Sequence, residues 1–137
     1  MNNGVAAEEA ERLDAICAAV SILPPESRRR IVELALENGY AAKDVAEIMA
    51  VSPPAVSRYI RGTLSPSPSA LCRLILGVHP RLQRRMLLEA ARSLWKATRV
   101  LLEVLGEQSD AAKLLEEIAD TVALLLEKNS QVYRSPL

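Results

Sequence analysis

Apolar residues recur every three or four positions along almost the whole chain, and this spacing is typical of amphipathic helices. The pattern predicts helices over about 5–22, 25–38, 42–49, 53–61, 68–76, 80–105 and 109–128. Pro24 and Pro25 separate the first two helices, because proline lacks an amide donor and disfavours helix in the residue before it. The sequence therefore predicts an all-α fold.

The predicted helices fall into four parts of the chain. Residues 1–23 supply an N-terminal helix, residues 24–78 a domain of short helices, residues 79–129 two long helices, and residues 130–137 a polar tail that we expect to be flexible. The two long helices predict an antiparallel hairpin. Its apolar stripes are too wide for one hairpin to enclose, so we expect residues 79–129 to form a homodimer. Two alternatives are that the hairpin closes the core of a monomer, or that its acidic last helix recruits a different protein.

The charges are segregated along the chain although their sum is zero. The 137 residues include 17 Lys and Arg and 17 Asp and Glu. Residues 24–100 hold 13 basic and 6 acidic residues, a net charge of +7, whereas residues 1–23 carry −3 (1 basic, 4 acidic) and residues 101–137 carry −4 (3 basic, 7 acidic). A basic centre between acidic ends is what phosphate binding requires, so the charge pattern favours nucleic acid as a partner of the central part.

Residues 42–62 predict two short amphipathic helices joined by a tight turn. Ser52 is a good N-cap for the second helix, and Pro53 follows at the first helical position, where a missing amide costs little. Val56 and Ile60 are its expected inward pair. The remaining face carries Ala55, Ser57, Arg58 and Arg61. This is the layout of a helix-turn-helix, in which the second helix enters the major groove of DNA.

The central domain also resembles a known family. Residues 42–62 are similar to the helix-turn-helix of bacterial and archaeal transcriptional regulators, and residues 51–75 resemble the Cro/C1-type domain. The matching positions are Val51, Ser52, Val56, Ser57, Tyr59, Gly62, Pro66, Leu71 and Leu74. The resemblance covers about residues 26–78 and implies a five-helix-type DNA-binding domain. It places Ser52, Pro53, Pro54, Ser57 and Arg58 at DNA-facing positions, and Lys43 and Arg61 near phosphates of double-stranded DNA.

Two departures from the family pattern bear on specificity. Ala50 stands at a turn position that is usually glycine, where a left-handed backbone costs Ala roughly 1 kcal/mol. Pro53 and Pro54 offer no side-chain donor to base edges, so direct readout rests on Ser57, Arg58 and Arg61. We therefore expect a small homodimeric transcriptional regulator. The alternatives are a low-specificity architectural DNA binder, and an antitoxin-like or partition-associated adaptor in which DNA binding is secondary.

Two further arginine clusters leave alternatives open. Arg28, Arg29 and Arg30 oppose the dipole of the helix they begin, so local stability does not explain them. They are expected either to contact nucleic acid or to form a solvated or intramolecular ionic face. Arg81, Arg84 and Arg85 either extend the basic surface or decorate their helix.

The sequence gives no case for an enzyme. It has no glycine-rich phosphate loop, no HExxH motif and no Cys/His ligand set, so no catalytic residue, cofactor or metal is expected. The single histidine, His79, is expected to serve the start of a helix or the surface. Cys17 and Cys72 are expected to be buried reduced thiols. No secretory signal and no apolar run of about 20 residues is present, so we expect a cytoplasmic protein away from membranes.

Overall fold

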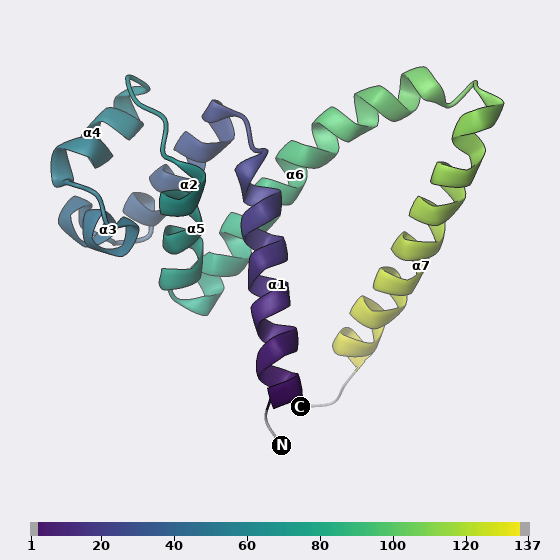
Figure 1. The fold of residues 1–137 in the computed structure, drawn as a ribbon, viewed down its shortest axis with the longest axis horizontal. Helices are drawn as coiled ribbons and strands as arrows, with labels where there is room; N and C mark the ends of the chain where they lie inside the picture. Colours follow the sequence, from purple (N-terminus) through teal and green to yellow (C-terminus); the bar gives the residue numbers. More distant parts are fainter. Residues whose placement is uncertain (1–2, 135–137) are drawn as a thin grey trace. The chain divides into compact units, whose positions relative to one another are not determined.

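The computed structural model describes residues 3–134, and these residues form an all-helical fold (Figure 1). The elements are α1 (Asn3–Ser21), α2 (Pro25–Glu37), α3 (Ala42–Met49), α4 (Pro53–Arg61), α5 (Pro68–Gly77), α6 (Pro80–Leu105), the 3-10 helix η1 (Ser109–Ala111) and α7 (Ala112–Arg134). The part of the chain that the structure describes contains no strand. The prediction of an all-α protein is therefore confirmed, and the bounds of α3, α4 and α6 are those that the sequence predicts.

Helix α7 is longer than the sequence pattern indicates. It continues through Arg134, so residues 130–134, which the sequence predicts as part of a flexible tail, are helical. The physical reason is that no proline or glycine interrupts the chain between Ala112 and Arg134, and polar residues alone do not end a helix. The remainder of the predicted tail, residues 135–137, lies outside the described residues.

The chain divides into two compact units, Met1–Trp95 and Lys96–Leu137. The division falls inside α6 and not between residues 78 and 79, where the apolar pattern changes. The first turns of α6 belong to the first unit because Leu82, Met86 and Ala90, spaced four residues apart, are buried in its core. The N-terminal helix α1 belongs to the same unit.

The first unit encloses one continuous apolar core. Helix α3 packs against both α4 and α5, α2 packs against all three of these helices, and α1 lies along α5 (Figure 1). The largest fully buried side chains are Val20, Leu23, Ile31, Val32, Val45, Met49, Val56, Leu71, Leu74, Ile75, Leu82 and Met86. Among the described residues, no polar or charged residue is fully buried, so burial of apolar surface is the main stabilising term of this unit.

The second unit encloses no comparable core. Ala111 is the buried residue within its described part, and α7 packs against the short helix η1 that precedes it. The exposed large apolar residues of this unit are Val100, Leu101, Val104, Leu105, Leu114, Val122, Leu124, Leu125, Leu126 and Val132. Within residues 3–134, no helix combines the length and the apolar character that crossing a lipid bilayer would require.

Helices α2, α3 and α4 end in the same hydrogen-bonded motif. In α3 the amide of Val51 donates to the carbonyl of Ala46 and the amide of Ala50 donates to that of Glu47. This pair of bonds is the Schellman motif, which requires a left-handed residue after the helix. Glycine takes that position after α2 and α4, at Gly39 (φ +96°) and Gly62 (φ +75°). After α3 the residue is Ala50, with φ 57°, as expected from the family resemblance.

We expect Ala50→Gly to raise the free energy of unfolding by about 0.5–1 kcal/mol, because glycine relieves the strain of a left-handed alanine but gains entropy in the unfolded chain. Urea denaturation followed by circular dichroism measures the change. The matched control is Ala91→Gly at an exposed interior position of α6, which should lower the free energy of unfolding by roughly 1 kcal/mol. Equal destabilisation by both variants would contradict the strain at Ala50.

Candidate nucleic-acid interface

Helix α4 has one buried face and one exposed face. Val56 and Tyr59 are buried, at 1% and 4% exposure, and Ile60 is half-buried. The buried face of α4 thus includes Tyr59 in addition to the predicted inward pair, Val56 and Ile60. Because Tyr59 is buried in the core, its ring is not available to stack on a base. The core fixes the rotation of α4, because its buried residues recur at three- and four-residue spacing.

The exposed face of α4 carries four of the residues that the sequence predicts to face DNA. Pro54, Ser57, Arg58 and Arg61 are all exposed, and their spacing of three and four residues places them on one side of the helix. Pro53 and Ser52 precede them at the exposed start of α4. The seventh predicted residue, Lys43, is exposed in the first turn of α3, so it belongs to a different helix.

Ser52 has a structural role at the start of α4. Its backbone is extended (φ −76°, ψ 150°), and its hydroxyl oxygen accepts a hydrogen bond from the amide of Ala55 at 3.4 Å. The N-cap role predicted from the sequence is confirmed. Pro53 follows at the first helical position. The amide of that residue has no acceptor within a helix, so its absence in proline costs no hydrogen bond.

The guanidinium groups of Arg58 and Arg61 form no hydrogen bond and no ion pair with any described part of the chain. The arginines at the start of α2 differ. Arg29 pairs with Glu33 at 3.0 Å, and Arg30 pairs with Glu37 at 2.7 Å and with Glu33 at 3.4 Å. The contacts of Arg29 and Arg30 are therefore those of an intramolecular ionic face, one of the two predicted alternatives, and their carboxylate partners lie on α2 itself.

Electrostatics within α2 reinforce this pairing. The hydrogen bond to Glu37 raises the pKa of the Arg30 guanidinium above its ordinary value, against a smaller lowering by burial. The third arginine of the cluster, Arg28, makes no carboxylate contact within the described residues. It donates to the carbonyls of Leu23 (2.8 Å), Ser21 (2.9 Å) and Pro66 (3.2 Å), and so ties the end of α1 to the loop before α5.

A contact that the sequence does not reveal supports the turn between α3 and α4. Arg73 on α5 donates from Nε to the carbonyl of Met49 at 2.9 Å. Close by, a Cβ on Gly77 would lie 2.5 Å from Cγ2 of Ile48, so α5 approaches α3 as closely as a glycine permits. Neither contact has a local sequence signal, because each joins residues more than twenty positions apart.

His79 acts at the start of α6, as expected. Its Nδ1 accepts a hydrogen bond from the amide of Leu82 at 3.2 Å, its own amide donates to the hydroxyl of Tyr40 at 3.0 Å, and the two rings stack with centroids 5.9 Å apart. These contacts join α6 to the segment before α3. Of the cluster that follows, Arg85 donates to Oδ1 of Asn38 at 2.8 Å, which is a structural contact.

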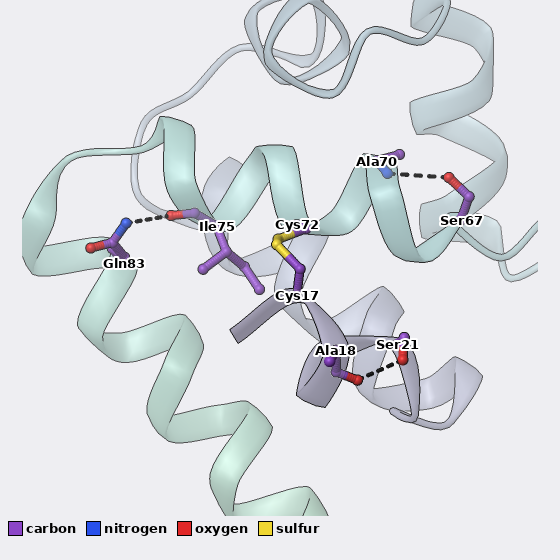
Figure 2. The surroundings of a disulfide bond; sticks show 8 residues. All are labelled: Cys17, Ala18, Ser21, Ser67, Ala70, Cys72, Ile75 and Gln83. Atoms are coloured by element: carbon purple, nitrogen blue, oxygen red, sulfur yellow. Dashed lines mark hydrogen bonds between the residues drawn. A yellow bond between two sulfur atoms is a disulfide. The ribbon is translucent and has the colours of Figure 1, made fainter. Parts of the chain in front are cut away.

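The expectation of two reduced cysteines is wrong. Cys17 and Cys72 form a disulfide, with their Cα atoms 5.5 Å apart and a sequence separation of 55 (Figure 2). The sequence shows that the two lie in different helices but does not show that α1 and α5 pack side by side. That packing brings both thiols within bonding geometry.

No protein-family model, no curated protein and no solved structure matches this chain. Its function is therefore inferred from its own residues.

We expect Ser52→Ala to lower the free energy of unfolding by about 1 kcal/mol, because the amide that Ser52 caps would be left without its acceptor. Chemical denaturation provides the measurement. Ser57→Ala is the matched control, since Ser57 is exposed in the interior of the same helix and should change stability by less than about 0.5 kcal/mol. A destabilisation no larger for Ser52→Ala than for Ser57→Ala would show that the cap contributes nothing.

Proposed function

We propose that this protein is a DNA-binding protein, a small homodimeric transcriptional regulator that inserts α4 into the major groove. The observation that carries the proposal is the exposed face of α4, where two guanidinium groups have no partner among the described residues. On α2, by contrast, Arg29 and Arg30 are paired with Glu33 and Glu37, and Arg28 donates to backbone carbonyls. Free guanidinium groups on a short helix whose other face is held by a core are suited to reading an anionic surface.

The dimensions of α4 support groove binding. An α-helix with its side chains is about 10–12 Å across, and the major groove is about 12 Å wide, so a helix such as α4 fits within it. The turn before α4 is held by the Schellman motif and by Arg73, so the helix would enter the groove without reorganisation. This use of α3 and α4 is the helix-turn-helix arrangement that the resemblance of residues 26–78 implies.

The side chains on the exposed face of α4 suggest which parts of DNA each residue would contact. Arg58 would donate to O6 and N7 of a guanine, and Ser57 would add a weaker hydrogen bond to a base edge. Arg61, in the last turn of α4, and Lys43, in the first turn of α3, would bind phosphates. Pro53 and Pro54 would make apolar contact with a thymine methyl group, which discriminates less than a hydrogen bond does.

The exposed apolar side chains of the second unit support dimerisation. Along α7 two positions recur every seven residues. They are occupied by Leu115, Ile118, Val122, Leu125, Asn129 and Val132, all of which are apolar except Asn129. Such a repeat is typical of the seam of a coiled coil, in which one asparagine specifies the register and the number of strands. We therefore assign the α7 seam to a second copy of this chain.

A dimer would also strengthen DNA binding. One α4 offers few base-reading side chains, whereas two copies related by a two-fold axis would read two half-sites together. The basic centre of the chain would then lie on DNA, and the acidic C-terminal part would remain away from phosphates.

We expect the double variant Arg58→Ala/Arg61→Ala to bind duplex DNA at least about tenfold more weakly. The slope of log K against log salt should fall by about 1, because loss of the phosphate contact of Arg61 leaves roughly one counterion unreleased. Fluorescence anisotropy at several salt concentrations gives both quantities, and sequencing of the fraction bound from a randomised duplex pool gives the motif.

The matched control is Arg12→Ala/Arg99→Ala, which removes two positive charges outside α2–α5 and should change the affinity by less than about twofold if the effect is local to α4. Salt-sensitive binding without an enriched motif would support the architectural alternative, which the proline pair favours. Absence of DNA binding by the native protein would overturn the proposal and favour the adaptor.

We expect Val122→Glu/Leu125→Glu to convert the dimer into a monomer of 15.0 kDa, because charged side chains would be buried at the seam without partners. Sedimentation equilibrium measures the mass. The control Ala123→Glu/Ser130→Glu adds the same charge away from the seam and should leave the dimer intact. A native protein that sediments as a monomer at its highest soluble concentration would contradict the assignment of α7.

A further inference from the structure

The two cysteines of the Cys17–Cys72 disulfide differ in burial. The disulfide joins α1 to α5 (Figure 2). Cys72, on α5, is buried at 4% exposure, whereas Cys17, on α1, is half-buried. Disulfides that are reached by an external thiol are reduced and reformed more readily than enclosed ones, because exchange requires direct attack on a sulfur. This disulfide therefore differs from a fully enclosed structural disulfide, in which both cysteine residues are buried.

Helix α1 contributes little to the core that it covers. Of its 19 residues, Val20 is the buried one, Ile16 is partly buried, and every described residue from Asn3 to Ala15 is exposed. Its principal neighbour is α5, to which the disulfide joins it. An isolated helix of this length is marginal in water, so the covalent bond carries much of the attachment of the N-terminal part.

The C-terminal end of α1 is held separately. Val20 and Leu23 are buried, and Arg28 donates to the carbonyls of Ser21 and Leu23 at 2.9 Å and 2.8 Å. The following segment begins with Pro24 and Pro25, which restrict the backbone. Without the disulfide, α1 would therefore remain attached at residues 20–23 and would be free to move at its N-terminal end.

The rest of the first unit does not need the N-terminal part of α1. Helices α2 to α5 and the start of α6 supply the core residues between Ile31 and Ala90, and within residues 3–16 only Ile16 packs against that core. Reduction of the disulfide should therefore release part of α1 and leave α4 in place.

We propose that the Cys17–Cys72 disulfide is a reducible latch, which holds α1 on α5 when oxidised and releases residues 3–16 when reduced. The reductant is a dithiol. One of its thiolates attacks Sγ of Cys17, which is the less buried of the two residues. The Sγ–Sγ bond breaks, and Cys72 leaves as a thiolate that takes a proton from water. The second thiol of the reductant then displaces Cys17 from the mixed disulfide. The protein gains two electrons and two protons, and the dithiol becomes a disulfide.

An open apolar pocket lies beside the disulfide, and release of α1 would widen it on the side that Cys17 lines. A cavity of about 680 Å³ lies next to the disulfide, and its lining includes Ile48, Leu76 and Gly77 together with Arg73. Arg73 is the residue that donates to the carbonyl of Met49. The latch thus borders the junction of α3 and α5, although it makes no contact with the exposed face of α4.

The test compares hydrogen exchange by mass spectrometry in the native protein after treatment with oxidised glutathione and after treatment with dithiothreitol. Alkylation with iodoacetamide first counts the thiols. We expect no adduct in the oxidised protein and two in the reduced one. Amides of residues 3–16 should exchange faster by roughly tenfold or more on reduction, whereas amides of α2 to α5 should keep their protection.

Cys17→Ser serves as the matched variant, since it should show the fast exchange of residues 3–16 with either reagent and no response to dithiothreitol. Three results would overturn the latch. These are thiols that remain alkylatable after oxidised glutathione, unchanged exchange in α1 on reduction, and loss of protection throughout α2 to α5. The test includes no DNA, so its outcome is independent of the function proposed above.

Discussion

The packing of α3 between α4 and α5 is the constraint on which the first unit depends. Val45 and Met49 are fully buried, and Gly77 lets α5 approach Ile48 more closely than any larger residue would. A short helix packed on two sides has little freedom to slide or rotate, because close-packed interiors resist displacement. The left-handed residue after α3 and the cap before α4 then set the direction in which the chain continues. The exposed side of α4 is a consequence of that packing.

Local chemistry made part of this arrangement predictable. Ser52, Pro53 and Gly62 determine the bounds of α4 through interactions within a few residues, whereas the left-handed turn at Ala50 was expected from the family resemblance. Exposure of the predicted DNA-facing residues also follows, because it depends on the spacing of Val56 and Tyr59. The α-helical fold and the course of α6 were predictable for the same reason.

Contacts between distant residues were not predictable from one sequence. The disulfide joins α1 and α5 across a separation of 55 residues, and Arg73 reaches Met49 across 24. Each depends on which helices become neighbours, and hydrophobic periodicity gives the buried face of a helix but not its partner. The net charge of a segment likewise does not show which of its charged side chains are paired within the protein. A count of +7 treats Arg30 and Arg58 alike, although the first is paired with Glu37 and the second has no partner in the described part of the chain.

The three hydrogen bonds of Arg28 impose a restriction on the evolution of this sequence. Its guanidinium spans the carbonyls of Ser21 and Leu23, at and just after the end of α1, and that of Pro66, in the loop before α5. A planar group with five donors can reach all three, whereas the ammonium of lysine concentrates its donors at one point. Among the described residues, the polar contacts of Arg29 and Arg30 are with carboxylates alone, so replacement by lysine, which keeps the positive charge, should cost little stability. Three adjacent and chemically identical residues are therefore under different selection, and position 28 should resist exchange among its descendants.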